Sequence, residues 1–263
     1  MFLAGLALER FWPLRRATRS KPRRVAINLS LAVASAILLR ATFYPLVMAT
    51  SFASAARGWG LLEFLPLPRL LKIVLAILTL DYTLYLWHRL NHGPAFLWRF
   101  HNVHHADLDM DVSTASRFHF GELMLSSGFR AGQIVVLGVD PFTLILFETL
   151  ITAAAQFHHA NVRLPVRFER ALNIFFVTPR MHGIHHSLVK GETDSNFSTI
   201  FSFWDRLHGT KILDVPQEDI VIGVPGYRDE AELTFWRCLL LPFGPLRPWR
   251  MKDGTIPARA PGG

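Results

Sequence analysis

The chain has 263 residues, of which 51% are hydrophobic and 18% are charged, and this composition argues against an ordinary soluble enzyme and against a disordered chain. The single cysteine, Cys238, excludes an intrachain disulfide and a thiolate-rich zinc or iron–sulfur site. The net charge of +8 is compatible with nucleic acid or anionic lipid as a partner, and the 12 histidines are the unusual feature.

The N-terminal segment is apolar from Met1 to Leu8 and strongly basic from there to residue 24. Its apolar part is too short to span a membrane. The apolar part also comes before the basic residues, whereas a signal peptide begins with its basic residues, so no cleaved signal is expected. Basic residues beside an apolar span favour lipid contact or an orientation signal over nucleic-acid binding. By the positive-inside rule, they place this segment in the cytoplasm.

Three apolar regions predict membrane helices. Val25–Ala49, with Arg40 as its only charged residue, and Leu70–Trp87 are each long enough to cross a bilayer core, which takes about 20 residues. Leu123–Phe157 is interrupted at Asp140–Pro141, which predicts a helical hairpin with its tip near Asp140. The expected fold is therefore an all-α integral membrane protein with about four membrane helices, two spans plus the hairpin.

This topology brings the histidine-rich segments to one side, as a cytoplasmic cap. The predicted organisation is a basic N-terminal segment (1–24), a membrane and histidine-box catalytic domain (25–210), and a C-terminal cap extension (211–263). Within the extension, Leu233–Phe243 is amphipathic and is expected in the membrane interface. Thr255–Gly263 is rich in Pro, Gly and Ala and is expected to be a disordered tail.

Three histidine clusters predict a metal centre. The first has a spacing of four, which places both imidazoles on one helix face, and the other two share the pattern H-x-x-H-H. Eight neutral imidazoles are too many for one ion, so the pattern favours two. Imidazole suits zinc, copper, iron and nickel alike. The candidate ligands are His88, His92, His101, His104, His105, His182, His185 and His186, and one of His158 and His159 is a candidate to complete the site.

A carboxylate lies in the second span, where ionisable groups are costly and usually functional. Helical spacing puts it on one stripe with two of the histidines, so the stripe reads Asp81, Tyr85, His88 and His92. We expect Asp81 to accept a hydrogen bond from a ligating histidine or from Tyr85. The alternative is a salt bridge to Lys72 or Arg40.

These motifs resemble the fatty acid hydroxylase/sterol desaturase superfamily over residues 80 to 210. The matching motifs are Asp81-Tyr-x-x-Tyr85-x-x-His88-Arg-x-x-His92, H-x-x-H-H, Phe157-His-His159-Ala-Asn161 and Thr178-Pro-x-Met-His182-x-x-His185-His186-Ser187. Two later motifs also match, Glu192-Thr-Asp194-Ser-Asn196-Phe and Trp204-Asp205-Arg-Leu-x-Gly209-Thr210.

The resemblance implies a membrane-bound non-heme di-iron oxidoreductase that uses O2 to hydroxylate or desaturate a lipid of sterol or fatty acyl type. By position, it implies two iron ions held by His88, His92, His101, His104, His105, His159, His182, His185 and His186. It gives no metal role to His119 or His158, and implies supporting roles for Asn196 and Asp205. No nicotinamide fingerprint or cytochrome-like module is visible, so a separate electron donor of reductase, cytochrome or ferredoxin type is expected, and no nucleic acid.

Two alternatives use the same histidines. A zinc-dependent membrane hydrolase would need no reductant, but the H-E-x-x-H helix that would supply a glutamate base is absent from the sequence. A heme-binding or metal-binding membrane protein without enzymatic activity does not account for two copies of H-x-x-H-H. The sequence does not choose between hydroxylation and desaturation, because both begin with the same hydrogen abstraction.

Overall fold

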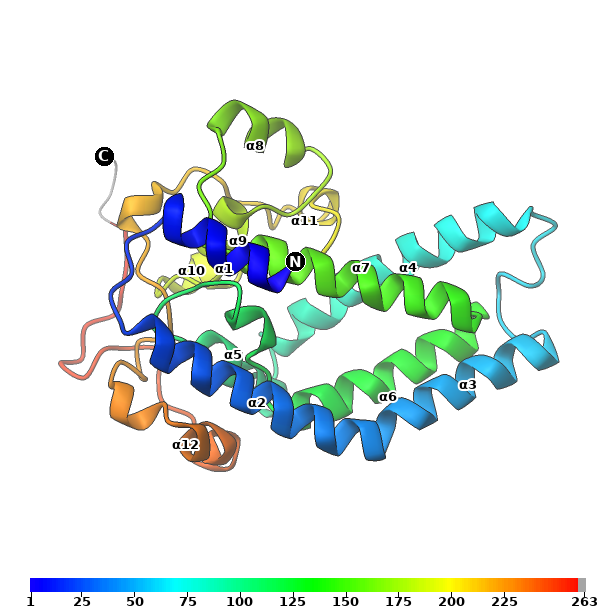
Figure 1. Ribbon diagram of the computed structural model, residues 1–263, viewed down its shortest axis with the longest axis horizontal. Helices are drawn as coiled ribbons and strands as arrows, with labels where there is room; N and C mark the ends of the chain where they lie inside the picture. Colours follow the sequence, from blue (N-terminus) through cyan, green and yellow to red (C-terminus); the bar gives the residue numbers. More distant parts are fainter. Residues whose placement is uncertain (260–263) are drawn as a thin grey trace.

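The computed structural model describes residues 1–259 and is built of helices, with no strand among these residues (Figure 1). The α-helices are α1 (Phe2–Phe11), α2 (Lys21–Ala41), α3 (Phe43–Arg57), α4 (Arg69–Asn91), α5 (Ala95–His105), α6 (Phe120–Leu137), α7 (Pro141–His159), α8 (Val166–Leu172), α9 (Pro179–His185), α10 (Lys190–Thr193), α11 (Phe203–Leu207) and α12 (Phe235–Leu240). Four 3-10 turns lie at Thr114–Ser116, Gln217–Asp219, Glu230–Glu232 and Leu241–Phe243. The prediction of an all-α fold is confirmed.

Within residues 1–259, two helices are long and apolar enough to cross a membrane, α2 and α4. The second agrees with the predicted span at Leu70–Trp87. The predicted span Val25–Ala49 is wrong in its bounds, because the chain breaks at Thr42 and the run is divided between α2 and α3. Thr42 has φ −124° and ψ −66°, and Pro45 follows in the first turn of α3, where its missing N–H is tolerated.

Helices α6 and α7 form a hairpin that turns at residues 138–140. Gly138 adopts φ +82°, and the side chain of Asp140 caps α7 by accepting from the backbone N–H of Phe142 and Thr143. The loop before α4 is joined to this tip, because the backbone N–H of Leu61 donates to the carbonyl of Val136 at 2.8 Å. The predicted hairpin geometry, with its tip near Asp140, is therefore present.

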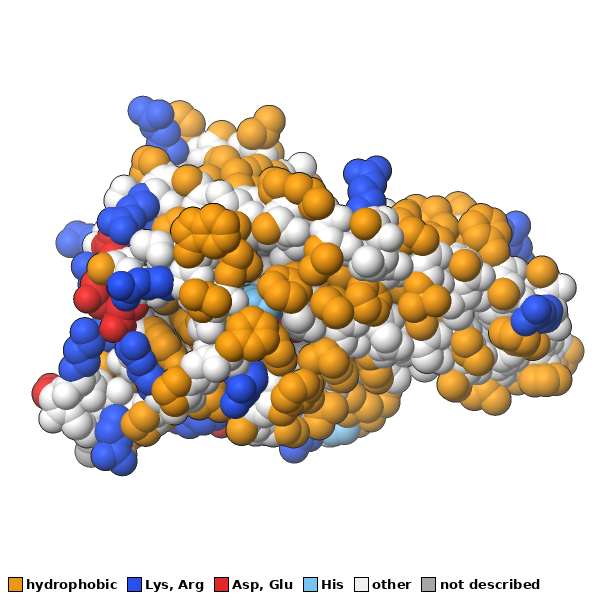
Figure 2. Space-filling view, turned by 90° about the horizontal axis from the view of Figure 1, so that it is seen from below, with side chains coloured by type: hydrophobic (Ala, Val, Ile, Leu, Met, Phe, Trp, Pro, Cys, Tyr) orange, Lys and Arg blue, Asp and Glu red, His pale blue; other side chains and the backbone are white. Residues whose placement is uncertain are grey.

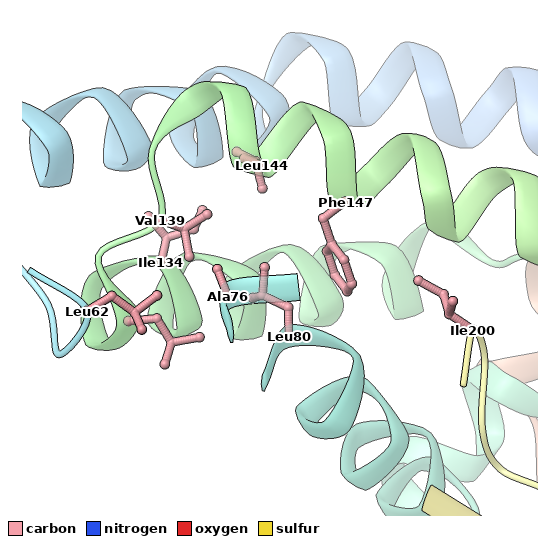
Figure 3. Close-up of a cluster of buried hydrophobic side chains, with 9 residues drawn as sticks. Leu62, Ala76, Leu80, Ile134, Val139, Leu144, Phe147 and Ile200 are labelled. Atoms are coloured by element: carbon pink, nitrogen blue, oxygen red, sulfur yellow. The ribbon is translucent and has the colours of Figure 1, made fainter. Parts of the chain in front are cut away.

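An apolar core joins the hairpin to α4. Leu80 of α4 and Phe147 of α7 are both fully buried, and Figure 3 shows them directed into the space between α4, α6 and α7. Ile200, from the segment that follows the third histidine motif, packs on the same cluster. Burial of these side chains fixes the hairpin and this later segment relative to α4.

The outer surface of the helices is apolar. In Figure 2, hydrophobic side chains are spread over the long right-hand part, where few charged side chains lie, whereas most of the charged side chains gather toward the left end. Only 22% of the most apolar window of α2, and of α4, is buried within the protein, so most of that surface faces outward. These features are those of a membrane protein.

The polar end of the molecule is held by buried charges. Arg24 of α2 donates from Nε to Asp107 at 2.7 Å and from Nη1 to Asp111 at 2.9 Å, and both carboxylates lie in the segment just after α5. The C-terminal part packs on the same region, where Cys238 joins a core cluster with Leu31. The predicted disordered tail is described as far as Arg259, which pairs with Glu192 at 2.7 Å. Residues 260–263 lie outside the described part.

Candidate metal centre

Two helices deliver most of the predicted ligands. α5 begins after Pro94 and ends at His105, so its last two turns carry the first H-x-x-H-H motif. α9 has Thr178 as its N-cap residue and Pro179 at its first position, and it ends with the second copy of the motif. The histidines form two groups of candidate ligands. In each copy of the motif, one histidine belongs to one group and the other two belong to the other group, so α5 and α9 each contribute to both.

The structure brings all nine predicted histidines together in these two groups. The first group draws on α4, α5 and α9 and contains His88, His92, His101, His105 and His185. The second draws on α5, α7 and α9 and contains His104, His159, His182 and His186. In each group, one nitrogen from every member lies within 4.8 Å of the others, so each group is able to hold a metal ion.

The second group has nearly the spacing of a coordination shell. Nε2 of His159 lies 3.2 Å from Nε2 of His104 and 3.0 Å from Nε2 of His182, and Nε2 of His186 lies 3.2 Å from that of His182. Bonds of about 2.0–2.1 Å from one ion to imidazole nitrogens separate neighbouring nitrogens by roughly 3 Å. The four nitrogens therefore fit around a single ion.

Hydrogen bonds at the far ring nitrogen orient several of these imidazoles. Nδ1 of His88 donates to the carbonyl of Phe197 at 2.7 Å, and Nδ1 of His185 donates to that of Ser195 at 2.7 Å. Nδ1 of His101 donates to the Glu122 carboxylate at 2.8 Å. With the proton fixed on Nδ1, Nε2 carries a free lone pair, and these three Nε2 atoms are buried without a hydrogen-bond partner among the described residues.

Burial keeps these imidazoles in the neutral, metal-binding form. Desolvation, followed by repulsion from neighbouring imidazoles, holds the pKa of five of these histidines well below the usual value of 6.5: His104, His105, His182, His185 and His186. A neutral imidazole has one nitrogen lone pair to donate to a cation. The site therefore has the donor chemistry that a divalent transition metal requires.

Residues 195–198 support the first group through their backbone. The Asp205 carboxylate accepts from the N–H of Phe197 at 2.8 Å and of Ser198 at 2.9 Å. Asn196 adopts φ +53°, and its side chain bonds the carbonyl of Met181 at 2.9 Å. Asp205 and Asn196 thus hold the segment whose carbonyls fix His88 and His185.

Asp81 does not have the partner that the sequence predicted. Its carboxylate accepts from the backbone N–H of Ile200 and Phe201 at 3.2 and 3.1 Å and from Nε1 of Trp204 at 2.8 Å. Tyr85 bonds Thr210 instead, at 3.0 Å. The prediction failed because Asp81 lies two helical turns from His88, so it reaches the segment that crosses α4 and not the histidines.

Three histidines lie outside both groups. His119 is the N-cap residue of α6, where Nδ1 accepts from Gly121 N–H at 2.9 Å and Nε2 donates to the carbonyl of Leu239 at 3.1 Å. His158 is buried, with its ring centroid 4.0 Å from that of His182, but belongs to neither group. His208 bonds Tyr82 at 3.1 Å. The first and last of these have ordinary hydrogen-bonding roles.

Glu122 is a functional candidate that sequence reasoning missed. It is 5% exposed and lies in the first turn of α6, where it accepts from His101. An acidic residue at the start of an otherwise apolar helix was the available signal, but its sequence distance from His101 concealed the pairing. The sequence could not predict that the backbone carbonyls of Ser195 and Phe197 orient histidines, because every residue has a carbonyl group.

The histidine motifs lie in a part of the chain that resembles known proteins. The family model for fatty acid hydroxylases matches residues 73–210, just over half of the chain. Ornithine lipid hydroxylase OlsE of Rhizobium tropici is 33% identical over 144 residues, which cover 54% of this chain and 42% of that protein. No solved structure matches the chain significantly.

Two human proteins are similar over stretches of comparable length. Cholesterol 25-hydroxylase is 27% identical over 146 residues, which cover 52% of this chain and 50% of that protein. Alkylglycerol monooxygenase is 25% identical over 156 residues, which cover 57% of this chain and 32% of that protein. The chain thus spans about half or less of the length of these relatives.

Proposed function

Because the chain belongs to the fatty acid hydroxylase family, we propose that it is a membrane-bound non-heme di-iron oxygenase that hydroxylates a lipid. The observation that carries the proposal is the convergence of nine buried histidines into two groups. The similar proteins are named as hydroxylases or a monooxygenase of lipids, which favours hydroxylation over desaturation. The ligands proposed are the nine histidines, one ion to each group.

In this proposal, two bound irons supply the activation of O2 that an unactivated C–H bond requires. Hydroxylation places one oxygen atom of O2 in the C–H bond and reduces the other to water with two electrons and two protons. A separate electron donor is therefore part of the proposal. The chain contributes the orientation of the imidazoles, through Glu122 and the carbonyls of Ser195 and Phe197, and the dry surroundings of the site.

The membrane arrangement is also proposed. α6 and α7 lie beside α3 and α4 (Figure 1), which supports a bundle in which the hairpin enters the bilayer together with α2 and α4. The basic residues before α2 favour a cytoplasmic cap that carries the histidines. Lipid that diffuses in the bilayer would then reach the site from the side of the helices.

Metal analysis tests the proposal. We expect elemental mass spectrometry of detergent-purified protein to find about two irons per chain. His104→Ala and His185→Ala, one from each group, should lose metal, whereas His208→Ala, outside both groups, should keep it. Two zinc ions without restoration of O2 consumption by iron would favour the hydrolase alternative. Wild-type protein that binds no metal when folded would overturn the proposal.

A further inference from the structure

A cavity of about 780 Å³ lies between α3, α6 and α7. Much of its wall is apolar, with Val47 and Met48 from α3 and Leu144 from α7. At one end it reaches Leu123, next to Glu122, and Gln156, three residues before His159. The cavity therefore runs along the hairpin toward the histidine groups, and its volume suits a lipid-sized molecule.

An ion pair interrupts the apolar wall half-way along the hairpin. Nε of Arg130 lies 2.9 Å from Oε1 of Glu148. The Arg130 side chain is 11% exposed, and it also donates to Gln133 at 2.6 Å and covers the ring of Phe147 at 4.7 Å. The Glu148 side chain is 50% exposed and lines the cavity. Arg130 is thus held in place, while Glu148 is open to the cavity.

The serine and threonine hydroxyl groups that α6 and α7 direct to the cavity already have partners. Thr149 and Thr152 each donate to the carbonyl one turn back on α7, at 2.8 Å. Ser126 accepts from Nε1 of Trp87 at 3.0 Å. Arg130 and Glu148 are the two charged side chains of the lining, and charged groups form stronger hydrogen bonds than neutral lining groups such as Tyr44 and Gln156.

A half-exposed carboxylate at this depth is costly in a bilayer, and such groups are usually retained for function. Building on the function proposed above, we propose that this cavity binds the lipid substrate and that Arg130 and Glu148 hold a hydroxyl group of it. A hydroxyl accepts from the guanidinium and donates to the carboxylate at once. A carboxylate or phosphate would meet Glu148, and an ammonium would meet Arg130. The substrate class is thus a neutral lipid alcohol.

The position of the pair sets which carbon reaches the metal centre. Arg130 lies eight residues from Glu122 along α6, and Glu148 lies eleven residues from His159 along α7. At about 1.5 Å per residue, the ion pair is therefore about 12 to 17 Å along the helix axes from these two residues beside the histidine groups. With carbon–carbon bonds of about 1.5 Å in a zigzag chain, this corresponds to roughly ten to thirteen bonds. Oxygen is therefore inserted far from the hydroxyl that anchors the lipid.

Thermal unfolding in detergent tests the binding, with 1-hexadecanol, hexadecane and palmitate as probes. We expect 1-hexadecanol to raise the Tm more than the other two. In Arg130→Met, its apparent affinity should fall roughly tenfold, as for the loss of one charge-assisted hydrogen bond. Lys72→Met is the matched control, because it removes the exposed ion pair with Glu63 outside this cavity.

Glu148→Gln provides a second variant should Arg130→Met fail to fold, since an amide still accepts and donates, and the alcohol should bind with intermediate affinity. Equal Tm shifts for 1-hexadecanol and hexadecane in the wild type would overturn the proposal, as would an unchanged affinity in Arg130→Met.

Product analysis tests the distance from the anchor. With iron, O2 and a reductant, we expect new hydroxyl groups in 1-hexadecanol roughly ten to thirteen bonds from the original one, and products within the first six carbons would overturn the proposed orientation. No turnover despite an alcohol-specific Tm shift would count against the proposed function and leave the binding site intact.

Discussion

His88 and Phe197 are joined by a hydrogen bond of 2.7 Å from the imidazole Nδ1 to the backbone carbonyl. They are 109 residues apart, and the N–H of Phe197 is itself held by Asp205 at 2.8 Å. A carboxylate on α11 thus orients a predicted metal ligand on α4 through the backbone of Phe197. Residues outside the two histidine groups therefore determine how well those groups are arranged.

Asp205→Ala should weaken metal binding without removing a ligand. The variant frees the N–H groups of Phe197 and Ser198, so the carbonyl that orients His88 loses its fixed position. We expect about a 10- to 100-fold lower iron affinity, measured by competition with a chelator. Asp214→Ala, which removes an exposed carboxylate nearby, is the control. Equal affinity in the two variants would contradict the proposed link.

Glu122→Ala removes the acceptor for Nδ1 of His101. The imidazole is then free to rotate or to move its proton to Nε2, the nitrogen proposed to bind metal. We expect a similar loss of affinity in the first group, and a smaller one for Glu122→Gln, whose amide oxygen still accepts. Absorption of a cobalt-substituted protein would report the change in coordination. An unaltered spectrum in Glu122→Ala would show that His101 needs no such support.

Arg24→Met should destabilise the fold through Asp107 and Asp111, because both buried carboxylates would lose the guanidinium that pairs with them. Loss of one partner from a buried network costs about 3–5 kcal/mol. Arg23→Met removes a neighbouring exposed pair with Glu230 at 3.6 Å and should cost no more than about 1 kcal/mol. Thermal unfolding of both variants in one detergent makes the comparison. Equal decreases in Tm for the two variants would contradict the stabilising role given to the buried Arg24 pairs.

Two glycines of α6 and its turn should respond in opposite directions to alanine. Gly138 has φ +82°, and a Cβ there would lie 2.3 Å from the carbonyl oxygen of Trp59, so Gly138→Ala should lower the Tm. At Gly128, a helical position, a Cβ meets nothing within 4 Å. Gly128→Ala should raise stability by about 0.5–1 kcal/mol. Tolerance of alanine at Gly138 would mean that the loop before α4 does not pack against the hairpin tip as described.

The sequence predicted those features that depend on local pattern. Apolar length and the Asp140–Pro141 break indicated α4 and the hairpin. The spacing of the histidines indicated a metal centre and their number indicated two ions, but the division into two groups comes from the structure. The break between α2 and α3 at Thr42 was not predicted, because the sequence is apolar on both sides of it. Asp81 was misassigned because helical spacing shows which face a residue occupies but not which distant segment crosses that face. The backbone carbonyls that orient the imidazoles depend on tertiary contacts alone.

α5 and α9 each contribute to both histidine groups, and this shared use has a consequence for assembly. An ion bound in one group restrains the rotation of the same two helices that carry ligands for the other. Binding of the first ion therefore already includes part of the conformational-entropy loss that ordering the second group would require. Uptake of the two ions is expected to be cooperative, so that partly loaded protein separates into empty and doubly loaded molecules, with few carrying a single ion.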